Sequence, residues 1–278
     1  YLVCAFDAPG KTFRDALYTE YKANRSAMPD DLQLQIPLIQ QMLEAMRIPV
    51  VMREGFEADD LIATLARAGE EQGMKVFVCS SDKDLRQLIN DRVKIFSLRK
   101  REVYDAESLL KDWGIRPDQV IEYQTLVGDS VDNVPGVEGV GPKTATKYLQ
   151  DYGTIANLIA HIDELKGKKK ENLQNALPKL ELSRKLVTLD TGMDVALDWR
   201  TWRVQEWDGP KLLDLCRTFG LRGFADQVRA TIKDPPAKSQ AITQGSLFGD
   251  PGSEPEAQAR GTQNPSLALR VQTKNGLL

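Results

Sequence analysis

Acidic side chains recur directly after apolar runs along the first half of this chain, where strands and helices are expected to end or begin. The eight residues are Asp7, Glu57, Asp59, Asp60, Asp82, Asp84, Asp129 and Asp132. Carboxylates that share a pocket raise one another's pKa, and hard divalent cations are natural partners to neutralise them. The pattern therefore predicts one convergent pocket suited to metal-dependent phosphate chemistry.

Each acidic cluster taken alone has a simpler explanation. Acids in the first turn of a helix, such as those at 57–60, complement the helix macrodipole. Asp82 and Asp84 could likewise serve only as capping residues. The combination favours metal binding, because every cluster follows an apolar run and offers at least two carboxylate oxygens.

Strands and helices alternate over the first hundred residues. Apolar runs predict strands at 2–6, 49–52, 75–79 and 93–98, and residues 102–104 are expected to pair with the last of these. Periodic apolar positions predict helices at 34–46 and 58–72, and Ser81 is a candidate N-cap for a helix over 82–89. This alternation predicts an α/β fold whose mostly parallel sheet binds ligands at the carboxyl ends of its strands.

Three regions differ in composition. Residues 1–105 carry the alternating pattern and form the expected α/β core, and residues 106–232 read as a mostly helical subdomain. Residues 233–278 are rich in proline and glycine, so we expect a disordered tail or linker.

The overall composition is that of an ordinary soluble globular protein. The chain has 278 residues, 41% hydrophobic and 28% charged, and its formal net charge is −3. A nucleic-acid partner is compatible with this charge, because the remainder is net positive once the eight pocket acids are set aside. The three cysteines lie far apart, which indicates a reduced, cytoplasmic setting. The chain opens on Tyr1 and at once enters a strand-like run, so we expect a fragment of a longer protein.

The order of the motifs resembles that of the 5′-nuclease family, which contains flap endonucleases and 5′→3′ exonucleases. Within the family, the N-terminal nuclease domain of bacterial DNA polymerase I is the most similar. The resemblance runs from about residue 1 to residue 224. The motifs that carry it are Phe6-Asp7, Glu57-Ala58-Asp59-Asp60, Ser81-Asp82-Lys83-Asp84, Gly128-Asp129-Ser130-Val131-Asp132-Asn133 and the glycine-rich run 135–145.

The resemblance implies a PIN-like fold with a two-metal site and a helix–three-turn–helix element that binds DNA. It implies that Mg²⁺ or Mn²⁺ ions activate a water molecule for in-line attack on a phosphodiester. The acids that match first-metal ligands are Asp7, Glu57, Asp59, Asp60, Asp82 and Asp84. Asp129 and Asp132 match the second metal, with Asp82 and Asp84 shared.

A basic segment follows Asp7 and contains Tyr21, Lys22 and Arg25. Lys22 and Arg25 are three residues apart and would share a face on a helix, so a solvated basic face is one interpretation. The resemblance implies instead an arch over the active site. Lys22 and Arg25 would then contact the scissile phosphate as catalytic residues beside Asp7, and Tyr21 would stack on a base.

A glycine-rich run then leads into a helix. Gly136, Gly139 and Gly141 allow close backbone approach or positive φ, and Lys143 and Thr144 open a helix whose N–H groups can bind an anion. A plain turn between helices explains the glycines equally well. The family order favours contact with the backbone of duplex DNA, which positions the duplex without reading sequence.

One feature of the family is absent from this sequence. The family normally opens with an earlier strand that ends in another metal-binding Asp, so we expect this chain to lack a central strand and to be weak or inactive. The alternatives are a DNA-binding module with lost catalysis, and a PIN-type ribonuclease, which would need neither the basic segment nor the glycine-rich run.

The expected substrate is DNA with 5′ flaps, nicks or RNA primers, handled by a monomer in the bacterial cytoplasm and nucleoid. A polymerase domain is expected to follow in the parent protein. Residues Gln244-Gly245-Ser246-Leu247-Phe248 resemble a peptide that docks on the sliding clamp, although an ordinary linker explains them too.

Overall fold

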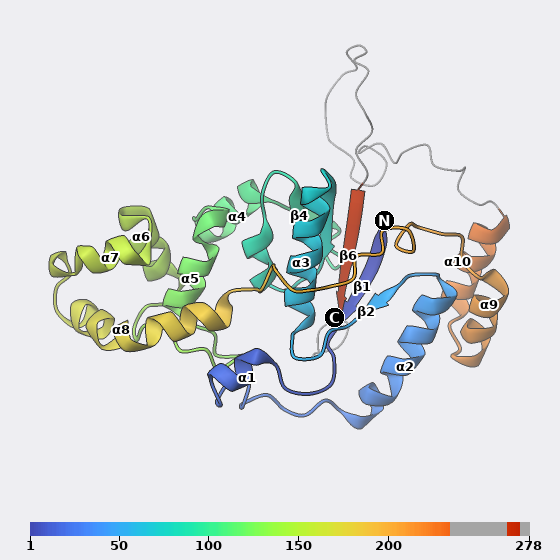
Figure 1. The fold of residues 1–278 in the computed structure, drawn as a ribbon, viewed down its shortest axis with the longest axis horizontal. Coiled ribbons are helices and arrows are strands. Elements are labelled where there is room, and N and C mark those ends of the chain that lie inside the picture. Colours follow the sequence, from blue (N-terminus) through green and yellow to red (C-terminus); the bar gives the residue numbers. More distant parts are fainter. Residues whose placement is uncertain (234–265, 273–278) are drawn as a thin grey trace, which may run out of the picture.

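A six-stranded sheet lies at the centre of the computed structural model, which describes residues 1–233 and the backbone of residues 266–272 (Figure 1). The strand order is β2-β1-β6-β3-β4-β5. The strands are β1 (Leu2–Phe6), β2 (Val50–Val51), β3 (Lys75–Cys79), β4 (Val93–Ser97), β5 (Glu102–Tyr104) and β6 (Ser266–Gln272). Neighbouring strands are parallel, except that β4 and β5 pair antiparallel. The predicted α/β class is confirmed, as is the pairing of residues 102–104.

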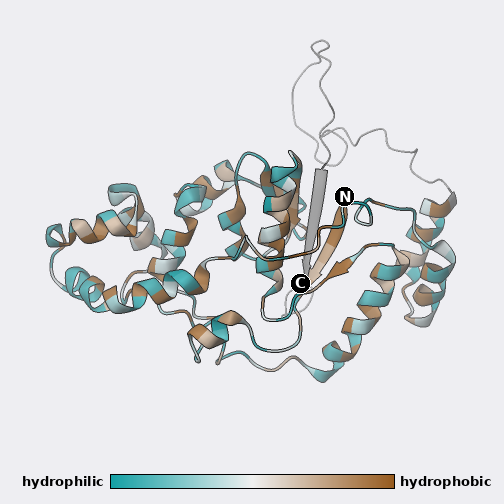
Figure 2. Cartoon of the chain, viewed as in Figure 1, coloured by the Kyte–Doolittle hydropathy of each residue, from teal (hydrophilic) through white to brown (hydrophobic). Residues whose placement is uncertain are grey.

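Helix α3 (Ala58–Glu71) packs its apolar stripe against the sheet. Leu61, Ile62 and Leu65 are at most 1% exposed and share one core cluster with Val76 and Val78 of β3. Strands β1 and β2 are coloured as apolar in Figure 2, as expected for strands covered on both faces. This core fixes the first turn of α3, and with it the acids at 57–60, beside the end of β1.

Residues 106–187 are mostly helical and lie on the side of the sheet drawn at the left of Figure 1. The α-helices of this region are α4 (Ala106–Trp113), α5 (Val120–Val127), α6 (Pro142–Tyr152), α7 (Ile155–Ala160) and α8 (Lys168–Val187). Two 3₁₀ helices accompany them, η2 (Pro117–Gln119) and η3 (Ile162–Glu164). These helices enclose a separate apolar core, which includes Leu109, Leu126, Leu149 and Leu173. Between β5 and residue 233 the described residues form helices and connecting segments and contain no named strand.

The remaining helices are α1 (Phe13–Leu17), α2 (Asp30–Ala45), α9 (Gly209–Thr218) and α10 (Arg222–Lys233). Helix α2 packs on α9 and α10 through a small core that includes Ala45, Leu212 and Val228. Among the residues that the structure describes, no helix is both long enough and apolar enough to cross a bilayer.

The predicted helix over residues 82–89 is wrong. The structure has a short 3₁₀ helix, η1 (Asp84–Leu88), and Ser81 does not cap it. The N–H of Asp82 donates to Ser80 Oγ at 3.0 Å, and the N–H of Asp84 donates to Asp82 Oδ1 at 3.0 Å. These local hydrogen bonds compete with an α-helical start and hold the segment in a turn.

Part of the expected disordered tail is ordered. Residues 266–272 form β6, which pairs in parallel with both β1 and β3, where we expected the sheet to lack a central strand. The apolar strands β1 and β3 would otherwise leave backbone groups unpaired in the middle of the sheet, at a large energetic cost. The rest of the tail, including the clamp-like residues 244–248, lies outside the described residues.

Candidate metal and nucleic-acid site

Four segments bring acidic side chains to one edge of the sheet. Asp7 follows β1, Glu57 and Asp59 stand at the start of α3, Asp82 and Asp84 follow β3, and the turn after α5 carries the last pair. The carboxyl ends of parallel strands meet at the same edge, which is why these distant residues converge. The N–H of Ala58 donates to Asp7 Oδ1 at 2.9 Å and ties the end of β1 to the start of α3.

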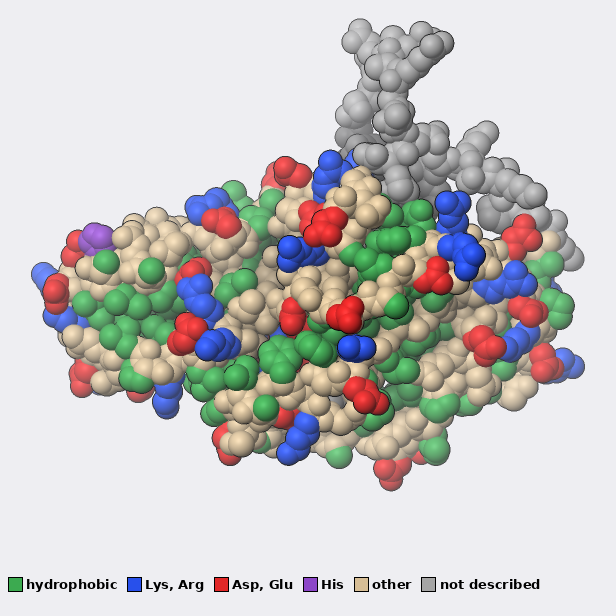
Figure 3. Space-filling view, in the orientation of Figure 1, with side chains coloured by type: hydrophobic (Ala, Val, Ile, Leu, Met, Phe, Trp, Pro, Cys, Tyr) green, Lys and Arg blue, Asp and Glu red, His purple; other side chains and the backbone are tan. Residues whose placement is uncertain are grey.

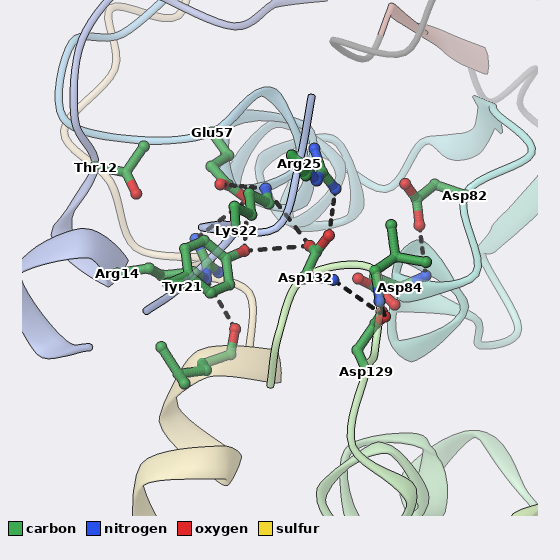
Figure 4. Close-up of polar contacts among 12 residues, drawn as sticks. Thr12, Arg14, Tyr21, Lys22, Arg25, Glu57, Asp82, Asp84, Asp129 and Asp132 are labelled. Atoms are coloured by element: carbon green, nitrogen blue, oxygen red, sulfur yellow. Dashed lines mark hydrogen bonds and ion pairs between the residues drawn. The ribbon is translucent and has the colours of Figure 1, made fainter. Parts of the chain in front are cut away.

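Three of the predicted ligands form a compact group. Asp84, Asp129 and Asp132 each offer a carboxylate oxygen, and these atoms all lie within 4.8 Å of one another (Figure 4). Asp129 and Asp132 belong to a turn closed by two backbone hydrogen bonds between Asp129 and Val134, of 2.9 and 2.7 Å. Oxygen ligands at this spacing suit a hard divalent cation.

Asp59 marks a second, adjoining part of the acidic pocket. Burial raises the pKa of Asp59 well above its usual range, and the charges of Asp82, Asp84, Glu57 and Asp7 raise it further. Its Oδ1 atom is buried without a hydrogen-bond partner. A carboxylate in this position lacks a positive partner, so the residues present fit a bound cation.

Asp84 connects the two parts of the pocket. Burial, followed by the charge of Asp82, raises the pKa of Asp84 to about 6, although Lys83 opposes the shift. Asp84 belongs to the compact group and also contributes to the raised pKa of Asp59. A ligand with this placement can be shared between two cations, as the sequence resemblance implied.

Asp60 is placed differently from the other predicted ligands. It is fully buried, and the Arg14 guanidinium donates to both of its oxygens, at 2.6 and 2.8 Å. The N–H groups of Asp190 and Glu57 donate to the same two oxygens. Because every side of this carboxylate is already used by the protein, we leave Asp60 out of the proposed ligand set.

Arg14, which the sequence analysis did not identify, is a buried tether. Beyond Asp60, it donates to the carbonyl oxygens of Leu186 at 2.8 Å and Thr188 at 3.0 Å. It therefore links α1, α3 and the end of α8 beneath the pocket. No sequence signal distinguishes it from other basic residues in the same stretch.

Besides Arg14, whose Nη1 lies 3.8 Å from Glu57 Oε2, three basic side chains pair with the pocket acids. Lys22 Nζ lies 2.5 Å from Glu57 Oε1 and 3.5 Å from Asp132 Oδ2, and Arg25 pairs with Asp132. Lys83 bridges Asp129 and Asp84, at 3.0 Å from the latter. Lys83 was not predicted, although its position between two acids of one motif is a signal that could have identified it.

The segment with Lys22 and Arg25 is a turn, so the idea that the two share a helix face is wrong. Lys22 has a φ of 55°, and its N–H donates to Asp132 O at 2.9 Å. A left-handed conformation is unusual for lysine and persists only when its surroundings impose it. Both side chains nevertheless reach the pocket, and Figure 4 shows Lys22 and Arg25 directed toward Asp132.

Tyr21 is not placed to stack on a base. It is 6% exposed, and its hydroxyl donates to Glu57 Oε2 at 3.2 Å, with Asp132 Oδ2 at 3.4 Å as a second acceptor. Burial and the charges of Glu57 and Asp132 raise the pKa of Tyr21. The hydroxyl instead contacts two pocket carboxylates, through packing of distant segments that sequence alone does not show.

The glycine-rich run serves two purposes. A Cβ on Gly136 would lie 2.3 Å from Val127 O, so this glycine allows two backbone segments to touch. Gly139 has a φ of 71°, which favours glycine, whereas Gly141 has open space around its Cβ position. Gly141 precedes α6, and the exposed Lys143 and the partly exposed Thr144 lie in its first turn. That helix start is accessible to an anion.

The surface charge gives no stronger indication of where a polyanion would bind. Figure 3 shows basic and acidic side chains interspersed over the face in view, so this face carries no continuous basic field. Binding would depend on local groups such as the start of α6.

Two family models together match residues 1–210. One, described as a 5′-3′ exonuclease N-terminal resolvase-like domain, matches residues 1–114, and the other, a 5′-3′ exonuclease C-terminal SAM fold, matches residues 115–210.

Curated relatives agree with these matches. A 5′-3′ exonuclease of Aquifex aeolicus is 40% identical over 233 residues, which cover 82% of this chain and 78% of the relative. DNA polymerase I of Rhizobium leguminosarum is 41% identical over 219 residues, which cover 78% of this chain and 22% of the relative. The chain thus spans about a quarter of the polymerase relatives' length.

Solved structures show the same fold. A bacteriophage T5 5′-exonuclease with bound zinc aligns with a TM-score of 0.57 at 23% identity, over 82% of this chain and 83% of the other. The catalytic core of Rad2 in complex with a DNA substrate aligns with a TM-score of 0.52 at 20% identity, over 81% and 76% of the two chains.

Proposed function

Because the chain belongs to the 5′-3′ exonuclease family, we propose that it is a divalent-metal-dependent nuclease that hydrolyses DNA phosphodiesters next to a 5′ end. The observation that carries the proposal is the compact group of Asp84, Asp129 and Asp132 beside the buried, unpaired Oδ1 of Asp59. Flaps, nicks and primer ends in replication and repair are the proposed substrates.

We assign the ligands by position in the pocket. Asp129, Asp132 and Asp84 would hold one cation, and Asp59, Asp82, Glu57 and Asp7 would hold the other together with Asp84. When bound, Mg²⁺ or Mn²⁺ supplies an activated water and neutralises charge on the phosphate. The raised pKa of Asp59 and Asp84 in the metal-free protein supports this assignment, since cation binding removes the repulsion.

Lys22 and Arg25 have a second role in this scheme. They pair with Glu57 and Asp132. A cation bound to these carboxylates would compete with both pairs, and Lys22 and Arg25 could then contact the scissile phosphate. The start of α6 would bind the duplex backbone at a second place, apart from the site of cleavage, through Gly141, Lys143 and Thr144.

The biological setting follows the family. The bacterial relatives support action in the cytoplasm at the nucleoid, and the polymerase relatives support a neighbouring polymerase domain in the parent protein. We keep docking on the sliding clamp through 244–248, and a monomeric state, as proposals of the same kind.

The decisive experiment compares cleavage of a 5′-flapped DNA duplex with cleavage of a single-stranded RNA, in Mg²⁺, in Mn²⁺ and with a chelator. We expect whatever flap cutting this chain supports, weak or strong, to occur only with metal, and Asp129→Asn to abolish it. Asp214→Asn, on the exposed surface of α9, is the matched control and should cut normally. Flap binding without cutting would favour a DNA-binding module, and preferential cutting of RNA would favour a ribonuclease.

A further inference from the structure

Gln124 is a buried amide in direct contact with the acidic pocket. It lies on α5, is 5% exposed, and its Nε2 donates to Asp84 Oδ1 at 2.5 Å. Its own Oε1 is buried without a partner. A glutamine buried with one unsatisfied oxygen needs a reason, since an unpaired buried polar atom destabilises the fold.

The hydrogen bond from Gln124 spans two parts of the fold. Asp84 lies at the start of η1, on the sheet side, whereas Gln124 lies on α5, the helix that leads directly into Asp129. Helix α5 is held firmly in place, because its own residues Tyr123 and Leu126 are at most 7% exposed and pack in the helical core. Gln124 therefore holds a carboxylate of one half at a fixed place relative to the other half.

Lys83 approaches the same oxygen of Asp84 but is poorly suited to hold that carboxylate in place. Its Nζ lies 3.0 Å from Asp84 Oδ1, yet its side chain is 46% exposed and is one residue away from Asp84. A flexible, solvated lysine neutralises charge without fixing position. The hydrogen bond from the buried Gln124 is better suited to fix the position of Asp84 relative to α5.

We propose that Gln124 is a positioning residue that holds Asp84 in register with Asp129 and Asp132 and thereby sets the metal affinity of this group. The inference rests on the proposed function, because it takes these acids as ligands. Hydrogen-bond partners of metal ligands typically change metal affinity 10–100-fold when removed.

A cavity of about 180 Å³ adjoins the group and is lined by Gln124, Asp84 and Asp129, among others. The Oε1 atom of Gln124 is itself buried, so the amide acts on the pocket through Nε2 alone.

The test is calorimetric titration of Mn²⁺ into the whole chain, without substrate. In Gln124→Leu, which keeps the volume and removes the donor, we expect the affinity of one class of sites to fall about 10–100-fold. Gln124→Met repeats the test with a more adaptable side chain, in case leucine perturbs folding. Thermal unfolding without metal reports whether each variant is folded.

A matched control is available in Gln119, which is 4% exposed and donates from Nε2 to Leu149 O and Gly153 O, both at 3.0 Å. Gln119→Leu should lower the melting temperature and leave Mn²⁺ affinity unchanged. Unchanged Mn²⁺ affinity in both folded Gln124 variants would refute the inference alone. An absence of saturable Mn²⁺ binding by the wild type would refute the proposed function itself.

Discussion

The two sides of the acidic pocket are built in different ways. On the sheet side, Asp59 stands on a helix anchored by the main core, and its pKa is raised because it is buried among other acids. On the helical side, burial also acts on Asp129, but Lys83 and the N–H groups of Val131 and Asp132 outweigh it and lower its pKa. The acids on the sheet side thus repel one another in a rigid setting. On the helical side, a lysine and the backbone N–H groups of a turn stabilise the ionised carboxylate.

This contrast separates two kinds of sensitivity. Changes on the sheet side should alter charge and metal binding while leaving the fold intact. Changes in the turn on the helical side should alter the fold itself, because that turn depends on glycine and on backbone hydrogen bonds. Each of the following predictions either sharpens this contrast or would abolish it.

The largest expected effect is on the sheet side. Asp59→Asn should lower the rate of flap cleavage by more than about 100-fold, beyond the range typical of residues that only support ligands. The same change should raise the melting temperature of the metal-free protein, because it removes one charge from a group of acids. Cleavage rates and melting temperatures measured on one preparation test both expectations. A fall in the melting temperature together with the cleavage rate would mean that Asp59 stabilises the fold.

The next effect is on the helical side. Gly136→Ala places a Cβ 2.3 Å from Val127 O, so we expect a loss of about 1–3 kcal/mol in the free energy of unfolding. Gly141→Ala is the matched control, since nothing lies within 4 Å of its Cβ position, and its stability should stay within about 0.5 kcal/mol of the wild type. Equal stabilities in urea titrations would show that the turn is more adaptable than its contacts indicate.

A third effect appears as pH dependence of the metal-free protein. Asp59 and Asp84 have pKa values above their usual range, about 6 for Asp84, so their contribution to stability is lost as the pH rises through that value. Between pH 8 and pH 5.5 the melting temperature should therefore increase on acidification, by roughly 2–4 °C per kcal/mol gained. Saturating Mg²⁺ should reverse this trend, because protons then compete with the cation. A decline on acidification without metal would contradict the pKa assignments.

The smallest effect concerns Lys83. Lys83→Met removes a cation that competes for Asp129 and Asp84, and should raise Mn²⁺ affinity by about 2–5-fold, as expected for a half-exposed ion pair. Lys147→Met, which removes an exposed partner of Asp151 on α6, should leave Mn²⁺ affinity unchanged. A weaker affinity in Lys83→Met would mean that Lys83 organises the pocket.

The sequence was sufficient for the outline of the site and insufficient for its inner contacts. Acids at the ends of apolar runs, such as Asp7 and Asp84, were predictable because strand ends meet at one edge of a parallel sheet. Asp60 is indistinguishable from Asp59 in sequence, yet it forms an ion pair with the buried Arg14, which is distant in the chain. The burial of Tyr21 and the bond from Gln124 also depend on long-range packing, which local patterns do not encode.

The pairing of β6 with both β1 and β3 has a consequence for how the protein is made. Strand β1 leaves the ribosome early, whereas residues 266–272 emerge only after every helix described here. The sheet described here is complete only when β6 has paired with both β1 and β3. A pairing between such distant segments is slow to form. Closing the sheet around β6 should therefore be among the slow steps in the folding of this chain.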